Sequence, residues 1–392
     1  MIKIKPYTEL PQKEEIFNLY LYLASKAMPF YPEDVFLEGY CFPDGHSKTA
    51  LSIYKSERKP RRRTESYKSI LKKYRIPQGD TAEKKIKCDA LLAKKIIRAN
   101  SKELYKFLYK TNKRKKGKKT GHVNPDNLRK LLTVSVGHDG IKELPFVADA
   151  VKAGIEEKKE MLKHVFRYED VFRSQGEIYR LVSLLGVEIC PYCNRLFITT
   201  IASGDKKMSP QLDHYRSKSQ YPFLALSIMN LVPSCSVCNH IKGDTSLEIL
   251  YPYEEEMGKR CSFSVDAEGD LTALTGTRIN HENLTIQLKQ SDEKSSLGQR
   301  IKASIDQLNL KKVYQSHRGY VSDLLLQRYI FTDEMVKDIR NSFPNLFKSE
   351  KEVREMLLLN KLDQEHWGDY PLGKLTHDIS EELDFLYAKS KA

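Results

Sequence analysis

Apolar positions recur at helical spacing along most of the chain. Within residues 14–28, Ile16, Leu19, Tyr20 and Leu23 stand at i, i+3, i+4 and i+7, which predicts an amphipathic helix. The same spacing predicts further helices at 67–74, 82–108, much of 124–185, 321–335, 352–362 and 377–387. The predicted fold class is therefore mainly α.

Strand patterns are confined to two short stretches. Residues 193–200 are rich in β-branched and aromatic side chains, and a turn at 202–205 separates them from a returning strand at 208–212. A loop and a short helix at 236–242 follow, so this stretch predicts a compact strand, strand, loop and helix unit. Alternating residues at 261–265, 271–274 and 284–288 predict a small sheet after it.

These patterns divide the chain into three regions. Residues 1–185 form a helical, strongly basic N-terminal region, and residues 186–250 form the compact mixed unit. Residues 251–392 form a C-terminal region that begins with short strands and continues as helices.

The positive charge is concentrated in a basic block, residues 51–120. It holds 25 Lys and Arg against 6 Asp and Glu, a balance of +19, which leaves −5 for the remainder of a chain whose total is +14. Its densest runs are 58–63 and 113–119; the second contains a glycine and is expected to be a mobile arm. Such runs bind phosphates without reading sequence, although a solvated surface with no ligand would have the same composition.

Neither a membrane span nor a disulfide framework is expected. No run of about eighteen apolar residues occurs, and the N-terminus resembles no signal peptide, so we expect a cytoplasmic protein. Of the seven cysteines, Cys41, Cys88 and Cys261 stand alone and are expected to be buried and inert.

The other four cysteines form two pairs of CxxC spacing, Cys190 with Cys193 and Cys235 with Cys238. Two such turns supply the four-sulfur cage of a structural Zn²⁺. A redox site would require only one CxxC, and four unrelated buried cysteines remain a further alternative. We therefore expect structural zinc, with a folded insert between the pairs.

The stretch between and around these pairs resembles a zinc-containing HNH endonuclease of the ββα-metal class. That family's pattern is a DH pair, a central NL and then C-x-x-C-[HN]-x-x-K-[GT]. This chain supplies Asp213-His214, Asn230-Leu231 and Cys235-x-x-Cys238-Asn239-x-x-Lys242-Gly243, in the order of the pattern. The resemblance covers about 60 of the 392 residues.

Hydrolysis of a phosphodiester requires an activated water and a cation on the scissile phosphate. His214 would take the proton from the water, and Asp213 would give an anionic oxygen to a catalytic Mg²⁺ or Mn²⁺. Asn239 would be a second, neutral ligand of that ion. Asn230 would either orient the imidazole of His214 or tie the loop through backbone hydrogen bonds.

Several nearby residues allow two interpretations. His240 could replace Asn239 as the metal ligand, although on a helix it points about 100° away. Arg216 and Lys218 are candidate phosphate-binding residues or ordinary loop charges. Lys242 could contact the substrate backbone or interact with the C-terminal end of its helix.

The resemblance also implies a biological setting. The segments CPYCN, DHYRSKSQYPFLALS and ILYPYEE are most similar to HNH nucleases of bacterial anti-phage defence systems, such as the nuclease subunit of the Septu type, which acts beside an ATPase. We therefore expect a DNA endonuclease with an ATPase partner. Two alternatives stay open: the same site acting on RNA such as tRNA, and a non-catalytic zinc-braced module that only binds nucleic acid.

Overall fold

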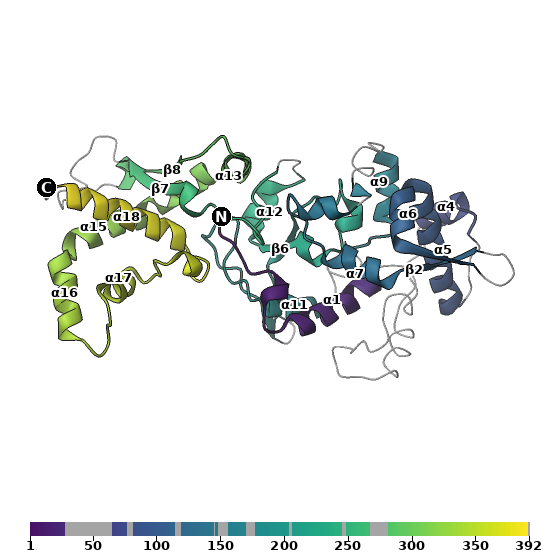
Figure 1. The fold of residues 1–392 in the computed structure, drawn as a ribbon, viewed down its shortest axis with the longest axis horizontal. Coiled ribbons are helices and arrows are strands. Elements are labelled where there is room, and N and C mark those ends of the chain that lie inside the picture. Colours follow the sequence, from purple (N-terminus) through teal and green to yellow (C-terminus); the bar gives the residue numbers. More distant parts are fainter. Residues whose placement is uncertain are drawn as a thin grey trace.

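The computed structural model describes residues 1–27, 65–76, 81–113, 119–144, 146–147, 156–169, 177–203, 206–244, 248–266 and 281–390. The molecule is elongated, with the helices of residues 65–108 at one end and the C-terminal helices at the other (Figure 1). The mainly helical class is confirmed, and the strands of the described part form two-stranded sheets. Among the described residues, no helix combines the length and apolar character that crossing a membrane requires.

The N-terminal region is built from helices α1 (Lys13–Ala27), α4 (Glu65–Lys73), α5 (Ala82–Asn100), α6 (Lys102–Leu108), α7 (Pro125–Thr133), α9 (Glu156–Lys163) and α11 (Glu177–Leu185). The single helix expected at 82–108 is interrupted at Ser101. This residue is extended, and its hydroxyl accepts a hydrogen bond from the Leu104 amide at 3.2 Å, which caps the start of α6.

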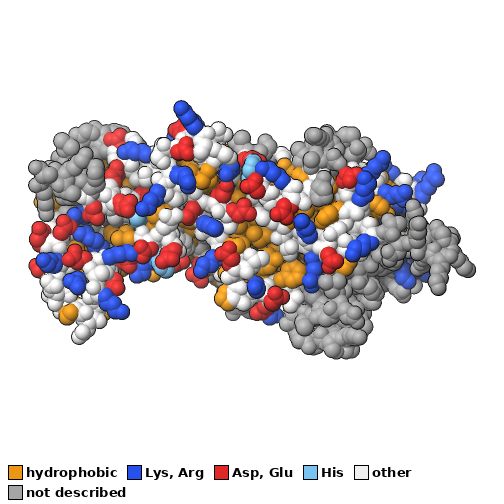
Figure 2. Space-filling view, viewed as in Figure 1, with side chains coloured by type: hydrophobic (Ala, Val, Ile, Leu, Met, Phe, Trp, Pro, Cys, Tyr) orange, Lys and Arg blue, Asp and Glu red, His pale blue; other side chains and the backbone are white. Residues whose placement is uncertain are grey.

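The basic block is described only in part. Residues 58–63 and 114–118 lie outside the described residues. Strand β1 (Tyr109–Lys113) pairs antiparallel with β2 (Lys119–Val123), so a hairpin flanks the segment expected to be a mobile arm. In the space-filling view, Lys and Arg side chains gather over this end, whereas both charges mix over the C-terminal helices (Figure 2).

The central region contains two strand pairs: β3 (Ile201–Ser203) with β4 (Lys206–Met208), and β5 (Gln211–His214) with β6 (Leu231–Ser234). Helix α12 (Ser236–Lys242) follows β6, as predicted. Between β5 and β6 the loop contains two 3-10 helices, η3 (Pro222–Leu224) and η4 (Ile228–Asn230).

The strand expected at 193–200 is wrong. Asn194 has a φ of +52°, a left-handed conformation that interrupts an extended strand, and only one bridge forms beyond it, between Phe197 and Ile189. The two strands that precede α12 are therefore β5 and β6, which lie on either side of the loop.

The N-terminal residues lie at the centre of the molecule rather than at its end (Figure 1). The Ile2 amide donates to the Pro191 carbonyl at 3.0 Å, and the Ile4 amide donates to the Pro252 carbonyl at 2.8 Å. Met1, Ile2 and Ile4 are buried, and Met1 and Ile4 belong to a large core that runs from α1 into the C-terminal helices. The first residues thus link the turn at Pro191 to the segment at Pro252.

In the C-terminal region, β7 (Cys261–Asp266) pairs antiparallel with β8 (Thr285–Gln290), which confirms the small sheet. The segment 271–274 lies outside the described residues. The helices are α13 (Ser296–Gln307), α14 (Leu310–Val313), α15 (Arg318–Ile330), α16 (Asp333–Ser342), α17 (Glu350–Leu358) and α18 (Gly373–Ser390). The remaining 3-10 helices of the described residues are η1 (Tyr7–Glu9), η2 (Gly140–Glu143), η5 (Gly258–Arg260), η7 (His281–Asn283), η8 (Tyr314–His317) and η9 (Gln364–His366).

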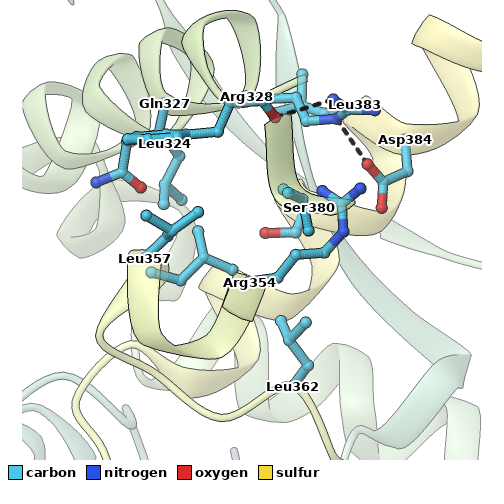
Figure 3. A pocket seen from close by; sticks show the side chains of 12 residues that line it. Leu324, Gln327, Arg328, Arg354, Leu357, Leu362, Ser380, Leu383 and Asp384 are labelled. Atoms are coloured by element: carbon cyan, nitrogen blue, oxygen red, sulfur yellow. Dashed lines mark hydrogen bonds and ion pairs between the residues drawn. The ribbon is translucent and has the colours of Figure 1, made fainter. Parts of the chain in front are cut away.

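The helix expected at 321–335 ends at Ile330, and α16 starts after Thr332, whose hydroxyl caps it. Helices α16 and α17 share a small core of their own around Val336 and Val353. A cavity of about 50 Å³ lies where they meet α15 and α18, with Leu324 and Leu357 in its wall (Figure 3).

Candidate metal centre and active site

The four paired cysteines converge on one point. The Sγ atoms of Cys190, Cys193, Cys235 and Cys238 all lie within 4.8 Å of one another, and all four residues are buried. Cys190 and Cys193 lie on the turn after α11, whereas Cys235 caps α12 and Cys238 lies in its first turn. Two turns that are distant in sequence therefore place their thiols at a single centre.

Backbone amides support the sulfurs of this centre. The Cys235 amide donates to the Cys190 sulfur at 3.4 Å, and the Cys238 amide donates to the Cys235 sulfur at 3.4 Å. Burial raises the pKa of the Cys190 thiol, whereas hydrogen bonds from neighbouring thiols, first that of Cys190, lower the pKa of Cys193. Several thiolates cannot be buried together without a cation, and four sulfurs are the donor set of structural zinc, so the cluster could hold Zn²⁺.

A cleft of about 560 Å³ lies beside this centre. Its walls come from β5 with Asp213 and His214, from α12 with Asn239, and from the N-terminal region with Tyr168 and Glu169. In the β5–β6 pair, Asp213 stands opposite Val232 and His214 opposite Leu231. The strand pair and α12 thus bring the two parts of the motif to one cavity.

The imidazole of His214 is held in one orientation. Its Nε2 lies 3.0 Å from the carbonyl oxygen of Ala225, and the ring of Tyr168 packs edge-on against it with 4.5 Å between the centroids. A carbonyl oxygen can only accept, so Nε2 carries the proton and Nδ1 keeps its lone pair. Burial lowers the pKa of His214 to about 4, which keeps the ring neutral at pH 7 and able to act as a base.

Asp213 forms a buried ion pair. The ammonium of Lys242 lies 3.1 Å from Oδ1 and 3.0 Å from Oδ2, and Tyr192 Oη donates to Oδ2 at 2.6 Å. Lys242 Nζ also donates to the His214 carbonyl at 2.8 Å. Burial raises the pKa of Asp213, whereas the ammonium of Lys242 and the hydroxyl of Tyr192 act in the opposite direction.

Lys242 therefore neither faces the substrate nor interacts with the C-terminal end of its helix, the two roles predicted for it. Its side chain is only 1% exposed and points into the protein, so its ammonium lies at Asp213 rather than at the surface where a substrate backbone would pass. The C-terminal end of α12 is closed instead by Gly243, whose φ of +53° is typical of glycine there and whose amide donates to the Asn239 carbonyl.

Asn230 ties the loop between the strands. Its Oδ1 accepts from the Arg216 amide at 2.7 Å, and its Nδ2 donates at 3.0 Å to the carbonyls of Arg216 and Leu224. Leu224 directly precedes Ala225, whose carbonyl holds His214. Of the two roles predicted for Asn230, the structure shows the one in which it ties the loop through backbone hydrogen bonds. Asn230 therefore acts on the imidazole of His214 only through this loop.

Asn239 and His240 point in different directions. Asn239 lines the cleft and contacts the Oε1 atom of Gln211 through its amide nitrogen, whereas His240 is exposed and does not line it. Asp213 and Asn239 thus place a carboxylate and an amide, oxygen donors of the kind that a hard divalent ion takes, at one cavity. Within the described part of the chain, only the four cysteines form a group of three or more potential metal ligands, so solvent and substrate would complete the catalytic site.

The two candidate phosphate-binding residues are separated. Lys218 lines the cleft, and its ammonium forms an ion pair with Glu169. Arg216 instead points toward the N-terminal region, where its Nε donates to the Val136 carbonyl at 3.0 Å and its side chain is 11% exposed. Lys218 is therefore the one of the two that a phosphate in the cleft can reach.

The cleft residues absent from the sequence-based set include Tyr168, Glu169 and Asp244. Asp244 accepts a hydrogen bond from the Ser217 hydroxyl at 2.8 Å, and its position directly after Lys242-Gly243 could have indicated it. Tyr168 and Glu169 lie more than forty residues before His214 in a helical region, and no local pattern indicated them.

Comparison with protein families gives one result. Residues 190–245 match the model of the HNH endonucleases, so this segment is an HNH endonuclease domain, and the resemblance is confirmed at the level of the HNH family. The match includes both CxxC pairs, Asp213-His214 and Asn239, and it indicates metal-dependent nuclease activity. Neither a curated protein nor a solved structure matches the chain.

Proposed function

We propose that this protein is a metal-dependent endonuclease that hydrolyses phosphodiester bonds in DNA. The observation that carries the proposal is His214, a neutral imidazole whose Nδ1 is left as a base by the Nε2 contact to Ala225. It shares a cleft with Asp213 and Asn239 inside the HNH domain.

The residues divide the chemistry among them. His214 Nδ1 takes a proton from the attacking water, and the Ala225 carbonyl stabilises the imidazolium that results by accepting from Nε2. A divalent ion held by Asp213 and Asn239 would neutralise charge on the scissile phosphate. Lys218 contacts a non-bridging phosphate oxygen in the cleft, and Asn230 positions His214 through the loop.

DNA is proposed because the basic block supplies phosphate affinity and the resemblance points to DNA nucleases. Its contacts are with the backbone, so the block gives little sequence preference. A role in bacterial anti-phage defence, with an ATPase partner that restrains or activates the nuclease, is proposed on the resemblance alone.

A non-catalytic nucleic-acid-binding module is the second candidate. It is favoured by the ion pair of Asp213 with Lys242, because a carboxylate already held by an ammonium is a weaker metal ligand. Such a module would bind nucleic acid in a salt-dependent manner and show no cleavage with any divalent ion.

The test is parallel digestion of supercoiled plasmid and total tRNA by the purified full chain with Mg²⁺, Mn²⁺ or EDTA. Plasmid nicking that requires the divalent ion supports the proposal. Cleavage of tRNA alone would keep the catalytic site and change the substrate to RNA. Binding without cleavage of either, in a zinc-loaded preparation and with a candidate partner added, would favour the binding module.

A further inference from the structure

Glu169 enters the cleft from the N-terminal region and contacts Lys218 on the opposite wall. Its carboxylate pairs with the ammonium of Lys218, which also lies 5.7 Å from the ring centroid of Tyr168. The same Tyr168 ring packs against His214. The Glu169–Lys218 pair is therefore one aromatic ring away from the proposed base.

Tyr168 fixes the place of Glu169. The residues before it, Val165 and Phe166, are buried in the main core, and the Tyr168 amide donates to the Phe166 carbonyl at 3.2 Å. The chain is therefore anchored immediately before Glu169, which places this residue beside the cleft.

The charges of the cleft oppose an incoming phosphate. Among the described residues, three carboxylates line it, those of Glu169, Asp213 and Asp244. Lys242 is buried against Asp213, so within the described part of the chain Lys218 is the lysine on the cleft wall, and Glu169 pairs with it. A phosphodiester that approached this wall would meet a carboxylate where it requires a cation.

We propose that Glu169 occupies the phosphate position of Lys218 in the free protein, so that a substrate phosphodiester binds there by displacing it. This inference rests on the proposed function, because it assigns a phosphate position and a built-in restraint to the same cleft. It makes the N-terminal region part of the substrate site.

Displacement is feasible because the pair is accessible. The Lys218 and Glu169 side chains are 42% and 41% exposed, and ion pairs of that exposure are weak. A substrate held along the basic block would present its phosphates at high local concentration and could replace Glu169.

The experiment measures binding rather than cleavage. In the full chain carrying His214→Ala, the Kd of a labelled duplex DNA, and in parallel of tRNA, is measured at one fixed salt concentration. Glu169→Gln keeps the shape and removes the charge, and should tighten binding of at least one probe about two- to fivefold. The matched control is Glu160→Gln, which removes a carboxylate paired with Lys163 on the surface of α9 and should leave the Kd unchanged.

The dependence on Lys218 completes the test. In a chain that also carries Lys218→Ala, Glu169→Gln should have no further effect on the Kd. The proposal would be overturned if Glu169→Gln left binding unchanged or weakened it, or if neither probe bound. It would also be overturned if Glu160→Gln gave the same gain in affinity, or if the gain persisted without Lys218. If the wild type cleaves nothing while the Lys218-dependent gain is present, the nuclease assignment fails and the phosphate position stands.

Discussion

His214 Nε2 lies 3.0 Å from the carbonyl oxygen of Ala225, a residue of the loop between the two strands of the site. The preceding carbonyl, that of Leu224, accepts from Asn230. Two successive carbonyls thus link the asparagine of the motif to its histidine. The tautomer of the proposed base depends on the loop as much as on the strand that carries it.

The pH dependence of cleavage should reflect the lowered pKa of His214. Burial favours the neutral ring and lowers its pKa to about 4, so the base form is present throughout the neutral range. With saturating metal, single-turnover cleavage should be flat with respect to His214 from about pH 6 to 8 and should decline only toward pH 4. An inflection near pH 6.5, the ordinary value for histidine, would contradict this environment.

The same shift predicts loss of stability in acid. An unfolded His214 binds a proton as the pH falls through about 6.5, while the folded one does not until about 4. The group's contribution to the free energy of unfolding is therefore present above pH 6.5 and is lost as the pH falls toward 4. Circular dichroism across the same buffers separates this unfolding from loss of the base.

Replacing Asn230 by alanine should reduce both stability and turnover. The change leaves the Arg216 amide and the carbonyls of Arg216 and Leu224 without these hydrogen bonds, a cost of about 1–3 kcal/mol. It also frees the loop that holds His214, so kcat should fall in the folded protein. Asn127→Ala is the control, because Asn127 donates to the Phe107 carbonyl, neither residue lines the cleft, and the change should affect stability alone.

Lys242→Met should leave the Asp213 carboxylate buried without its cation. Breaking a buried ion pair in this way costs about 3–5 kcal/mol, measured as the free energy of unfolding in urea. Lys374→Met removes a second buried lysine, paired with Asp378, and should destabilise to a similar degree while cleavage persists in the folded fraction. A Lys242→Met chain as stable as the wild type would show that the pair does not form in solution.

Zinc content should depend on the four clustered cysteines and on no others. Cys238→Ser should lower the zinc bound per chain and destabilise the HNH domain, because structural zinc contributes directly to folding. Cys88→Ser, at a buried cysteine outside the cluster, should keep full zinc occupancy. Equal zinc content in the two variants, measured by elemental analysis, would argue against the four-sulfur site.

Local patterns in the sequence predicted much of the fold. The period of apolar residues was sufficient for α1, and the spacing between the motif's second CxxC and Lys242-Gly243 was sufficient for α12. Local pattern was insufficient for the strand pairing, because β-branched residues at 193–200 favour extended backbone but do not determine a partner strand. The left-handed Asn194 and the thiol cluster constrain that segment instead.

The sequence predicted the cleft residues that lie close together in the chain and missed those that come from distant segments. Asp213, His214 and Asn239 lie in one continuous motif, and their shared cleft follows from it. Glu169 comes from the N-terminal region, so only the packing of that region against β5 brings it to Lys218. The buried position of Lys242 was also missed, since an isolated lysine on a short helix carries no sign of its partner.

The most direct test of the central claim compares plasmid nicking by wild type, His214→Ala and His240→Ala, each with Mg²⁺, Mn²⁺ or EDTA. If His214 is the base, its loss should slow cleavage about 10²- to 10⁴-fold, while His240→Ala, at an exposed position outside the cleft, cleaves as the wild type does. EDTA should abolish cleavage in both active proteins. Equal metal-dependent nicking by wild type and His214→Ala would contradict the assignment of His214 as the base.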